Sequence, residues 1–255
     1  MSVREMMRRD WDDRARRDAF HYIASWKQEW NIDSFLASGR EDYASLVWPI
    51  LERCGISENG EVMVELGCGA GRMTPSFARR YRRVVALDLS VEMLRRARQI
   101  HAEQQNILWL RVGGTDLACL RSGSADFLFS YLVLQHLPTE DLVFDYIREF
   151  LRVLRPGGAF LFQFNGSHKP TMNLRGRFAW GTVDALWSAR MVFLSRAVAR
   201  LLRLDPAAAG KSWRGAAIEA ARIVSDLRLN GGEVRELSGE HTTMAWCCGV
   251  KKTDA

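Results

Sequence analysis

Short apolar runs and segments with helical spacing alternate along the middle of the chain. Runs typical of buried strands occupy residues 62–66, 84–88, 107–112, 126–131 and 159–164. Apolar side chains at helical spacing occupy residues 72–81, 91–102 and 142–154. Strands that alternate with helices predict a mostly parallel sheet with right-handed crossovers and helices on its faces.

The first part of the chain has a different pattern. Residues 4–30 are polar, with aromatic side chains at helical spacing, and residues 42–54 continue a helical pattern. A turn-forming stretch at residues 57–60 then leads into the first strand. We therefore expect residues 1–56 to form an N-terminal helical cap.

The alternation also stops after the fifth strand. We interpret residues 166–213 as a helical insertion that serves as a substrate lid. Residues 214–255 then supply a helix at 214–227 and two strands, 233–237 and 242–250, whose short connection predicts an antiparallel hairpin at the sheet edge. Together with a core at residues 57–165, they predict a doubly wound, mostly parallel, seven-stranded α/β sheet of Rossmann-like type.

Composition narrows the class of protein. The 255 residues suffice for one α/β domain with an insertion. No apolar stretch approaches the roughly 20 residues of a membrane span, and the start of the chain lacks the apolar region of a secretory signal, so we expect a cytoplasmic protein. The five cysteines form no C-x-x-C pair and no histidine has zinc-ligand spacing, so we expect no metal.

Positive charge is concentrated in the insertion. Residues 166–215 hold nine basic and two acidic side chains, a net charge of +7, whereas the whole chain carries +6. Residues 184–204 predict an amphipathic basic helix. Three interpretations stay open: a cap helix over the ligand crevice, recognition of an anionic substrate, and attachment to an anionic membrane or a partner. Nucleic-acid binding has no support beyond charge.

A glycine-rich turn gives the strongest chemical signal. Gly67, Gly69 and Gly71 follow the first strand, where doubly wound sheets bind ligands. Glycines let the backbone approach a ligand, and we expect their amide groups to point at a negative group. Asp88 ends the second strand, where an acidic residue binds ribose hydroxyls. The dinucleotide pattern G-x-G-x-x-G would need glycine in place of Arg72, which disfavours a dehydrogenase.

Residues 62–72 resemble the first motif of class I S-adenosylmethionine-dependent methyltransferases. The resemblance continues through residues 87–90, 114–117, 126–138 and 154–158. It implies that the Gly67–Gly71 backbone holds the methionine part of the cofactor and that Glu65 either orients this loop or reaches the cofactor's ammonium through water. Asp88 would bind the ribose.

The same resemblance assigns the rest of a cofactor site. Met93 would lie on the adenine, Asp116 would accept a hydrogen bond from the adenine amine, and Leu117 would cover its other edge; ordinary core packing is the alternative for Met93 and Leu117. Ser130 and Tyr131 would lie beside the sulfonium. The predicted cofactor-binding set is Glu65, Gly67, Gly69, Gly71, Asp88, Leu89, Met93, Thr115, Asp116, Leu117, Ser130 and Tyr131.

Methyl transfer from a sulfonium depends mainly on positioning in a site closed to water. His136 is the candidate base for a hydroxyl acceptor, and a structural role is its alternative. Candidates to line the acceptor pocket are the aromatic residues Trp11, Tyr22, Phe178, Trp180 and Trp213, each of which could instead serve packing. Residues 130–133 lack the Asn/Asp-Pro-Pro pattern of nucleobase amino methyltransferases.

These observations predict transfer of a methyl group from S-adenosylmethionine to an oxygen or nitrogen of a small molecule, with an anionic acceptor as one option. Two other hypotheses remain: an RNA-modifying methyltransferase that uses the basic insertion, and a non-catalytic S-adenosylmethionine-binding module. The intact glycine turn and Asp88 argue against the second. The sequence does not determine the oligomeric state.

Overall fold

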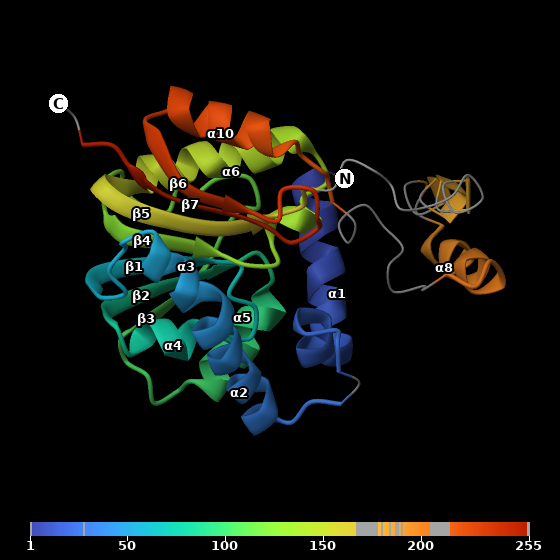
Figure 1. Ribbon diagram of the computed structural model, residues 1–255. Helices are drawn as coiled ribbons and strands as arrows, with labels where there is room; N and C mark the ends of the chain where they lie inside the picture. Colours follow the sequence, from blue (N-terminus) through green and yellow to red (C-terminus); the bar gives the residue numbers. More distant parts are fainter. Residues whose placement is uncertain are drawn as a thin grey trace.

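A seven-stranded sheet with helices on both faces forms the body of the protein (Figure 1). The computed structural model describes residues 2–27, 29–166, 178–179, 181–183, 185–186, 189, 191–204 and 215–253. The strands are β1 Gly60–Leu66, β2 Tyr81–Asp88, β3 Ile107–Arg111, β4 Ala125–Ser130, β5 Leu154–Phe164, β6 Gly232–Ser238 and β7 Ala245–Lys251.

The strand order is β3-β2-β1-β4-β5-β7-β6. The first five strands are parallel to their neighbours, and β7 pairs antiparallel with both β5 and β6. The order reverses between β1 and β4, which is where doubly wound sheets bind ligands. The predicted fold class and the terminal antiparallel hairpin are confirmed.

Helices cover the sheet and frame the carboxyl ends of its strands. Their bounds are α1 Val3–Ile23, α2 Ile32–Asp42, the π-helix η1 Tyr43–Val47, α3 Trp48–Arg53, α4 Thr74–Ala78, α5 Val91–Ile100, the 3-10 helix η2 Leu134–His136, α6 Glu140–Val153, α8 Val192–Leu201 and α10 Ala220–Leu229. Side-chain caps fix two of the starts: Ser90 accepts from the Met93 amide at α5, and Thr139 accepts from the Leu142 amide at α6.

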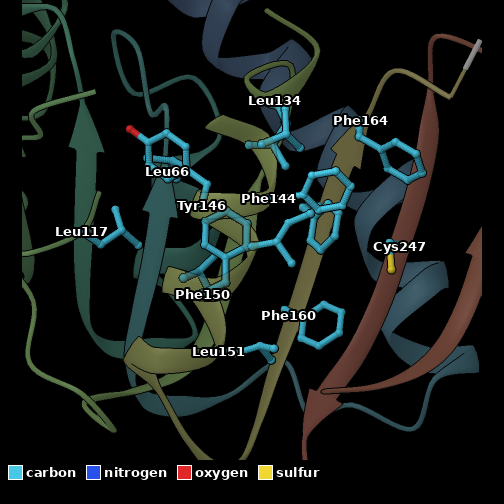
Figure 2. Close-up of a cluster of buried hydrophobic side chains, with 14 of the residues drawn as sticks. Leu66, Leu117, Leu134, Phe144, Tyr146, Phe150, Leu151, Phe160, Phe164 and Cys247 are labelled. Atoms are coloured by element: carbon cyan, nitrogen blue, oxygen red, sulfur yellow. The ribbon is translucent and has the colours of Figure 1, made fainter. Parts of the chain in front are cut away.

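Two apolar layers hold the helices on the sheet. Successive residues of a strand point to opposite faces, so Phe127 and Phe129 of β4 pack on one face while Leu128 packs on the other. Figure 2 shows the layer between α6 and the sheet, to which Phe150 of α6 and Phe160 of β5 both belong. The ring of Phe150 lies 5.8 Å from that of Phe162 in β5, between centres. The alternating apolar runs seen in the sequence therefore bury both faces of the central strands.

Several predicted boundaries were wrong. The helix expected at residues 72–81 is only α4, because Tyr81 already begins β2 and its ring is buried against Phe127. The helix expected at 42–54 is interrupted by η1. The helix expected at 214–227 begins at Ala220 and ends at Leu229. The N-terminal helical pattern ends at Ile23, and its helix is kinked at Asp18.

The sequence predicted a basic amphipathic helix at residues 184–204, with a cap over the crevice, recognition of an anionic substrate and attachment to an anionic membrane or a partner as its open interpretations. The helix described in this range is α8. In Figure 1 this helix lies apart from the sheet, beyond α1. Its buried residue Ala199 packs with Val183, Val198 and Leu204 rather than with the core layers of the sheet.

Gly71 fits its position for reasons of packing. Its φ of +82° lies in the left-handed region, and a Cβ there would come within 2.6 Å of His101 Nε2 and 2.8 Å of the Trp109 ring. Gly123 has a similar φ of +65° but no atom within 4 Å of the place of a Cβ. Substitutions at both glycines strain the backbone, but only a side chain at Gly71 would also overlap with its neighbours. A comparison of the two positions therefore distinguishes backbone strain from steric overlap.

We expect Gly71→Ala to lower the free energy of unfolding by about 2–4 kcal/mol and Gly123→Ala by about 1–2 kcal/mol. The additional loss at Gly71 comes from the overlap with His101 and Trp109. Urea denaturation of both variants measures the difference. Equal losses would show that the close packing around Gly71 contributes nothing to stability.

Candidate active site

A pocket of about 480 Å³ opens at the carboxyl ends of β1, β2 and β4, beside the reversal in strand order. Its volume suits a small organic ligand. Ten residues predicted from the sequence line it: Trp11, Tyr22, Glu65, Gly67, Gly69, Asp88, Leu89, Met93, Tyr131 and His136. The fold thus gathers residues from α1, the glycine turn, α5 and the segment after β4 around one space.

The glycine turn after β1 presents bare backbone to this pocket. Gly67 and Gly69 have φ values of +77° and +55°, which favour glycine. Their amide groups bond within the protein: Gly67 donates to the Leu87 carbonyl at 2.7 Å, and Gly69 donates to Asp88 Oδ2 at 2.8 Å. The Gly69 amide thus points at a negative group, the Asp88 carboxylate, and both amides tie the turn to β2.

Asp88 connects the glycine turn to α5. Its Oδ2 accepts from Gly69 and its Oδ1 accepts from the Ser90 amide at 2.8 Å. Burial raises the pKa of Asp88 to about 6, although these amide hydrogen bonds oppose the rise. The Leu89 amide contributes a third backbone hydrogen bond, so the carboxylate uses most but not all of its roughly four acceptor positions on the backbone.

Asp12 joins α1 to the same place. The Ser90 hydroxyl donates to Asp12 Oδ1 at 2.6 Å, and the Glu92 amide donates to the same oxygen at 3.2 Å. Asp12 thereby adds a negative charge at the start of α5, which the helix dipole favours. Sequence analysis missed this residue, because an acidic side chain in a charged helix carries no distinguishing pattern.

Glu65 is a buried acid beneath the glycine turn. The Thr74 hydroxyl donates to Glu65 Oε2 at 2.5 Å. Burial raises the pKa of Glu65 to about 7, while the Thr74 hydrogen bond and the positive charge of Arg72 oppose the rise. A cation that approaches this buried carboxyl would stabilise its ionised form, which burial disfavours.

Arg72 is the described lining residue with a permanent positive charge. Its side chain is only 3% exposed and pairs with Asp42 Oδ2 at 2.8 Å. The guanidinium lies 5.1 Å from the ring centre of Trp26 and 5.8 Å from that of Tyr131. Sequence analysis used Arg72 only as the place where a glycine is absent, and its ion pair with a distant helix gave no local signal.

Aromatic side chains of α1 face the segment after β4. The rings of Trp11 and His136 lie 5.4 Å apart between centres, at an angle of 65°. The Arg14 guanidinium lies over the rings of Trp11 and Tyr22 and bonds Asp10 one turn earlier. Gln135 Nε2 lies 3.2 Å from His136 Nε2. This side of the pocket combines apolar walls with a titratable imidazole.

Six described residues of the predicted sites do not line the pocket: Gly71, Thr115, Asp116, Leu117, Ser130 and Phe178. Leu117 is fully buried in the core layer under α6. Ser130 is also buried, and its hydroxyl donates to the Leu66 carbonyl at 3.2 Å. Thr115 donates to Asp116 Oδ2 at 3.0 Å, so these two residues bond each other.

The predicted acceptor residues of the insertion are not brought to the pocket in the described part of the chain. Phe178 is 81% exposed. Trp180 and Trp213 lie outside the described residues. Among the described residues, no group of His, Cys, Asp and Glu side chains could hold a metal ion, and no helix is long and apolar enough to cross a membrane.

Comparison with known proteins agrees with the site. A family model described as a methyltransferase domain matches residues 64–162. A malonyl-(acyl-carrier protein) O-methyltransferase from Serratia marcescens is 37% identical over 111 residues, which cover 42% of this chain and 40% of that protein. A trans-aconitate 2-methyltransferase from Azoarcus sp. (strain BH72) is 34% identical, over 60% of this chain and 54% of that protein.

The chain spans only about half or less of the length of these two curated relatives. Among solved structures, the magnesium protoporphyrin IX methyltransferase from Synechocystis PCC 6803 with bound SAH aligns with a TM-score of 0.61 at 18% identity. That alignment covers 97% of this chain and 99% of the other. At this identity the likeness concerns the fold. The part of the chain that matches the methyltransferase-domain model, residues 64–162, contains the glycine turn and the point where the strand order reverses.

Proposed function

We propose that this protein transfers a methyl group from S-adenosylmethionine to a hydroxyl oxygen of a small, negatively charged molecule. One observation carries the proposal. A single pocket of about 480 Å³ has a buried acid, Glu65, and a half-buried acid, Asp88, together with aromatic walls and the imidazole of His136. The acids suit a cationic methyl donor, and the imidazole suits an acceptor that must lose a proton.

The lining residues match the chemistry of the donor. S-adenosylmethionine carries a sulfonium, an ammonium, a carboxylate and a ribose. The remaining acceptor capacity of the Asp88 carboxylate would serve the ribose, and Glu65 would favour the cationic groups. Met93, which is buried at the start of α5 and lines the pocket, would pack on the adenine.

The chain's own residues would prepare the acceptor. When bound, the cofactor supplies a methyl carbon attached to a positively charged sulfur. Trp11, Tyr22 and Tyr131 would exclude water and hold the acceptor oxygen in line with that carbon. His136 would take the hydroxyl proton, which leaves the oxygen more nucleophilic.

Arg72 supports the negative charge that we assign to the acceptor. Its guanidinium is buried on the wall of the pocket and keeps donor groups beyond its ion pair with Asp42. The curated relatives include enzymes named for malonyl and trans-aconitate acceptors and for ubiquinone biosynthesis. The described residues give no comparable support for RNA methylation, because the pocket is small and its lining is largely apolar.

We also propose that one part of the chain binds the methyl donor and that another part covers the pocket. Residues 57–165 and 214–255 would form the donor-binding core, because they supply the whole sheet. Residues 1–56 would form the cap, because Trp11 and Tyr22 of α1 line the pocket.

The donor assignment is tested at Asp88. We expect Asp88→Asn to weaken S-adenosylmethionine binding by about 1.5–3 kcal/mol, the scale of a hydrogen bond to a charged group. Isothermal titration calorimetry with the donor and with its demethylated product measures the change. Asp13→Asn, in an exposed ion pair of α1, is the control and should bind as tightly as the wild type. Unchanged affinity in Asp88→Asn would place the donor elsewhere.

The raised pKa values predict how donor binding depends on pH. A cationic donor favours ionised acids, so binding lowers their pKa and releases protons. Affinity should therefore rise as the pH increases through the pKa values of about 6 for Asp88 and about 7 for Glu65. We expect roughly tenfold tighter binding at the alkaline end of this window, by calorimetry. Glu65→Gln should remove the rise near pH 7; a wild-type affinity that falls with pH would contradict the assignment.

The role of His136 requires an acceptor, which a screen with methyl-labelled donor over hydroxylated acids, phenols and amines would supply. With that acceptor we expect His136→Gln to lower kcat about 100-fold and to leave donor affinity unchanged. The exposed His241→Gln is the matched control. Full turnover in His136→Gln would show that this residue is not the base, and methylation confined to amines would refute the hydroxyl acceptor.

A further inference from the structure

The outward face of α8 is apolar. Phe193 is 88% exposed and Leu201 is 81% exposed, and both lie on one side of the helix because they are eight residues apart. The exposed Ala197 lies between them at the same spacing, and Leu194 beside them is 41% exposed. Large apolar side chains exposed in a contiguous group mark an interaction surface.

The opposite face of α8 already has its partners. Ser195 and Ala199, four residues apart, are both buried. The Ser195 hydroxyl donates to the Val183 carbonyl at 2.9 Å, and Ala199 packs against Val183. The helix therefore has a conventional inner face, and its exposed apolar residues are additional to the ones that hold it in place.

Basic side chains border this apolar face. Arg200 is exposed on α8 next to Leu201, and the exposed Arg203 follows the helix. The sequence of residues 166–215 carries a net charge of +7, so the surrounding segment has almost no negative charge to offset them. The same segment contains tryptophans at positions 180, 187 and 213, a residue type enriched at membrane interfaces.

We propose that α8 docks this protein on the surface of a membrane that contains anionic lipids. Phe193, Leu194 and Leu201 would enter the boundary between headgroups and acyl chains, while Arg200 and Arg203 would pair with lipid phosphates. A helix of ten residues is far shorter than the roughly 20 of a span, so it would lie in the plane of the membrane.

The two features together favour a lipid surface over other partners. RNA would use the arginines, but aliphatic side chains such as Leu201 would gain little from it. A second copy of the chain would bring the same positive segment, and the two would repel each other. An anionic lipid surface satisfies both the apolar face and the positive charge.

The experiment is flotation of the full-length protein with vesicles. Phosphatidylcholine mixed with phosphatidylglycerol is compared with phosphatidylcholine alone, at low and high salt. We expect binding to the anionic vesicles, with affinity about tenfold lower in Arg200→Glu and at least tenfold lower in the double variant Phe193→Ser, Leu201→Ser. Leu229→Ser, which changes an equally exposed leucine of α10, should bind like the wild type.

Each variant must bind the donor as tightly as the wild type and melt at the same temperature. We expect this because the substituted side chains are exposed. Absence of flotation in the wild type would refute the proposal, as would equal binding to neutral vesicles or an equal loss in Leu229→Ser. Binding of tRNA that Arg200→Glu abolishes, without flotation, would assign the surface to nucleic acid. Dimerisation that the double variant abolishes would assign it to a second copy. The donor-binding experiments above are independent of these outcomes.

Discussion

The pocket depends on the way one carboxylate joins two turns. Asp88 accepts a hydrogen bond from Gly69 in the turn after β1 and another from Ser90 at the start of α5. These bonds add to the one from the Gly67 amide to the Leu87 carbonyl, which also ties the glycine turn to β2. Ser90 then passes the connection on to α1 through Asp12. The cap and the core are thus held together at the point where the proposed ligand would bind.

The electrostatics of the pocket follow from this construction. Two acids lie in a largely apolar environment, which raises the pKa of both, and a buried arginine lies across from them. Buried charges are costly unless they are paired. Arg72 forms an ion pair with Asp42. Glu65 instead accepts a hydrogen bond from the Thr74 hydroxyl, and the charge of Arg72 only partly offsets the rise in its pKa. Because neither Glu65 nor Asp88 forms an ion pair among the described residues, a positively charged ligand would stabilise their ionised forms.

Sequence analysis identified the fold because apolar strands and glycine turns are local patterns. The order of strands β1 to β5 along the chain and the position of the pocket followed from them, although β2 and β5 begin earlier than predicted, at Tyr81 and Leu154. Residues that act across long sequence distances were missed: Arg72 meets Asp42 of another helix, and Asp12 meets Ser90. Roles carried over from the family also varied in outcome, since Asp88 and Met93 line the pocket while Leu117 is core.

The insertion shows a different limit of sequence analysis. Its helical pattern was recognised, but a pattern of apolar spacing does not state what an apolar face contacts. The sequence therefore left open whether that face packs on the protein or binds something else. The structure buries the small residues Ser195 and Ala199 and leaves Phe193 exposed.

The strand order also determines when the sheet can be completed during synthesis. β7 lies between β5 and β6, although it follows both in the chain. While the ribosome is still producing β7, the edge of β5 has no neighbour on that side, and the apolar residues there remain open to other nascent chains.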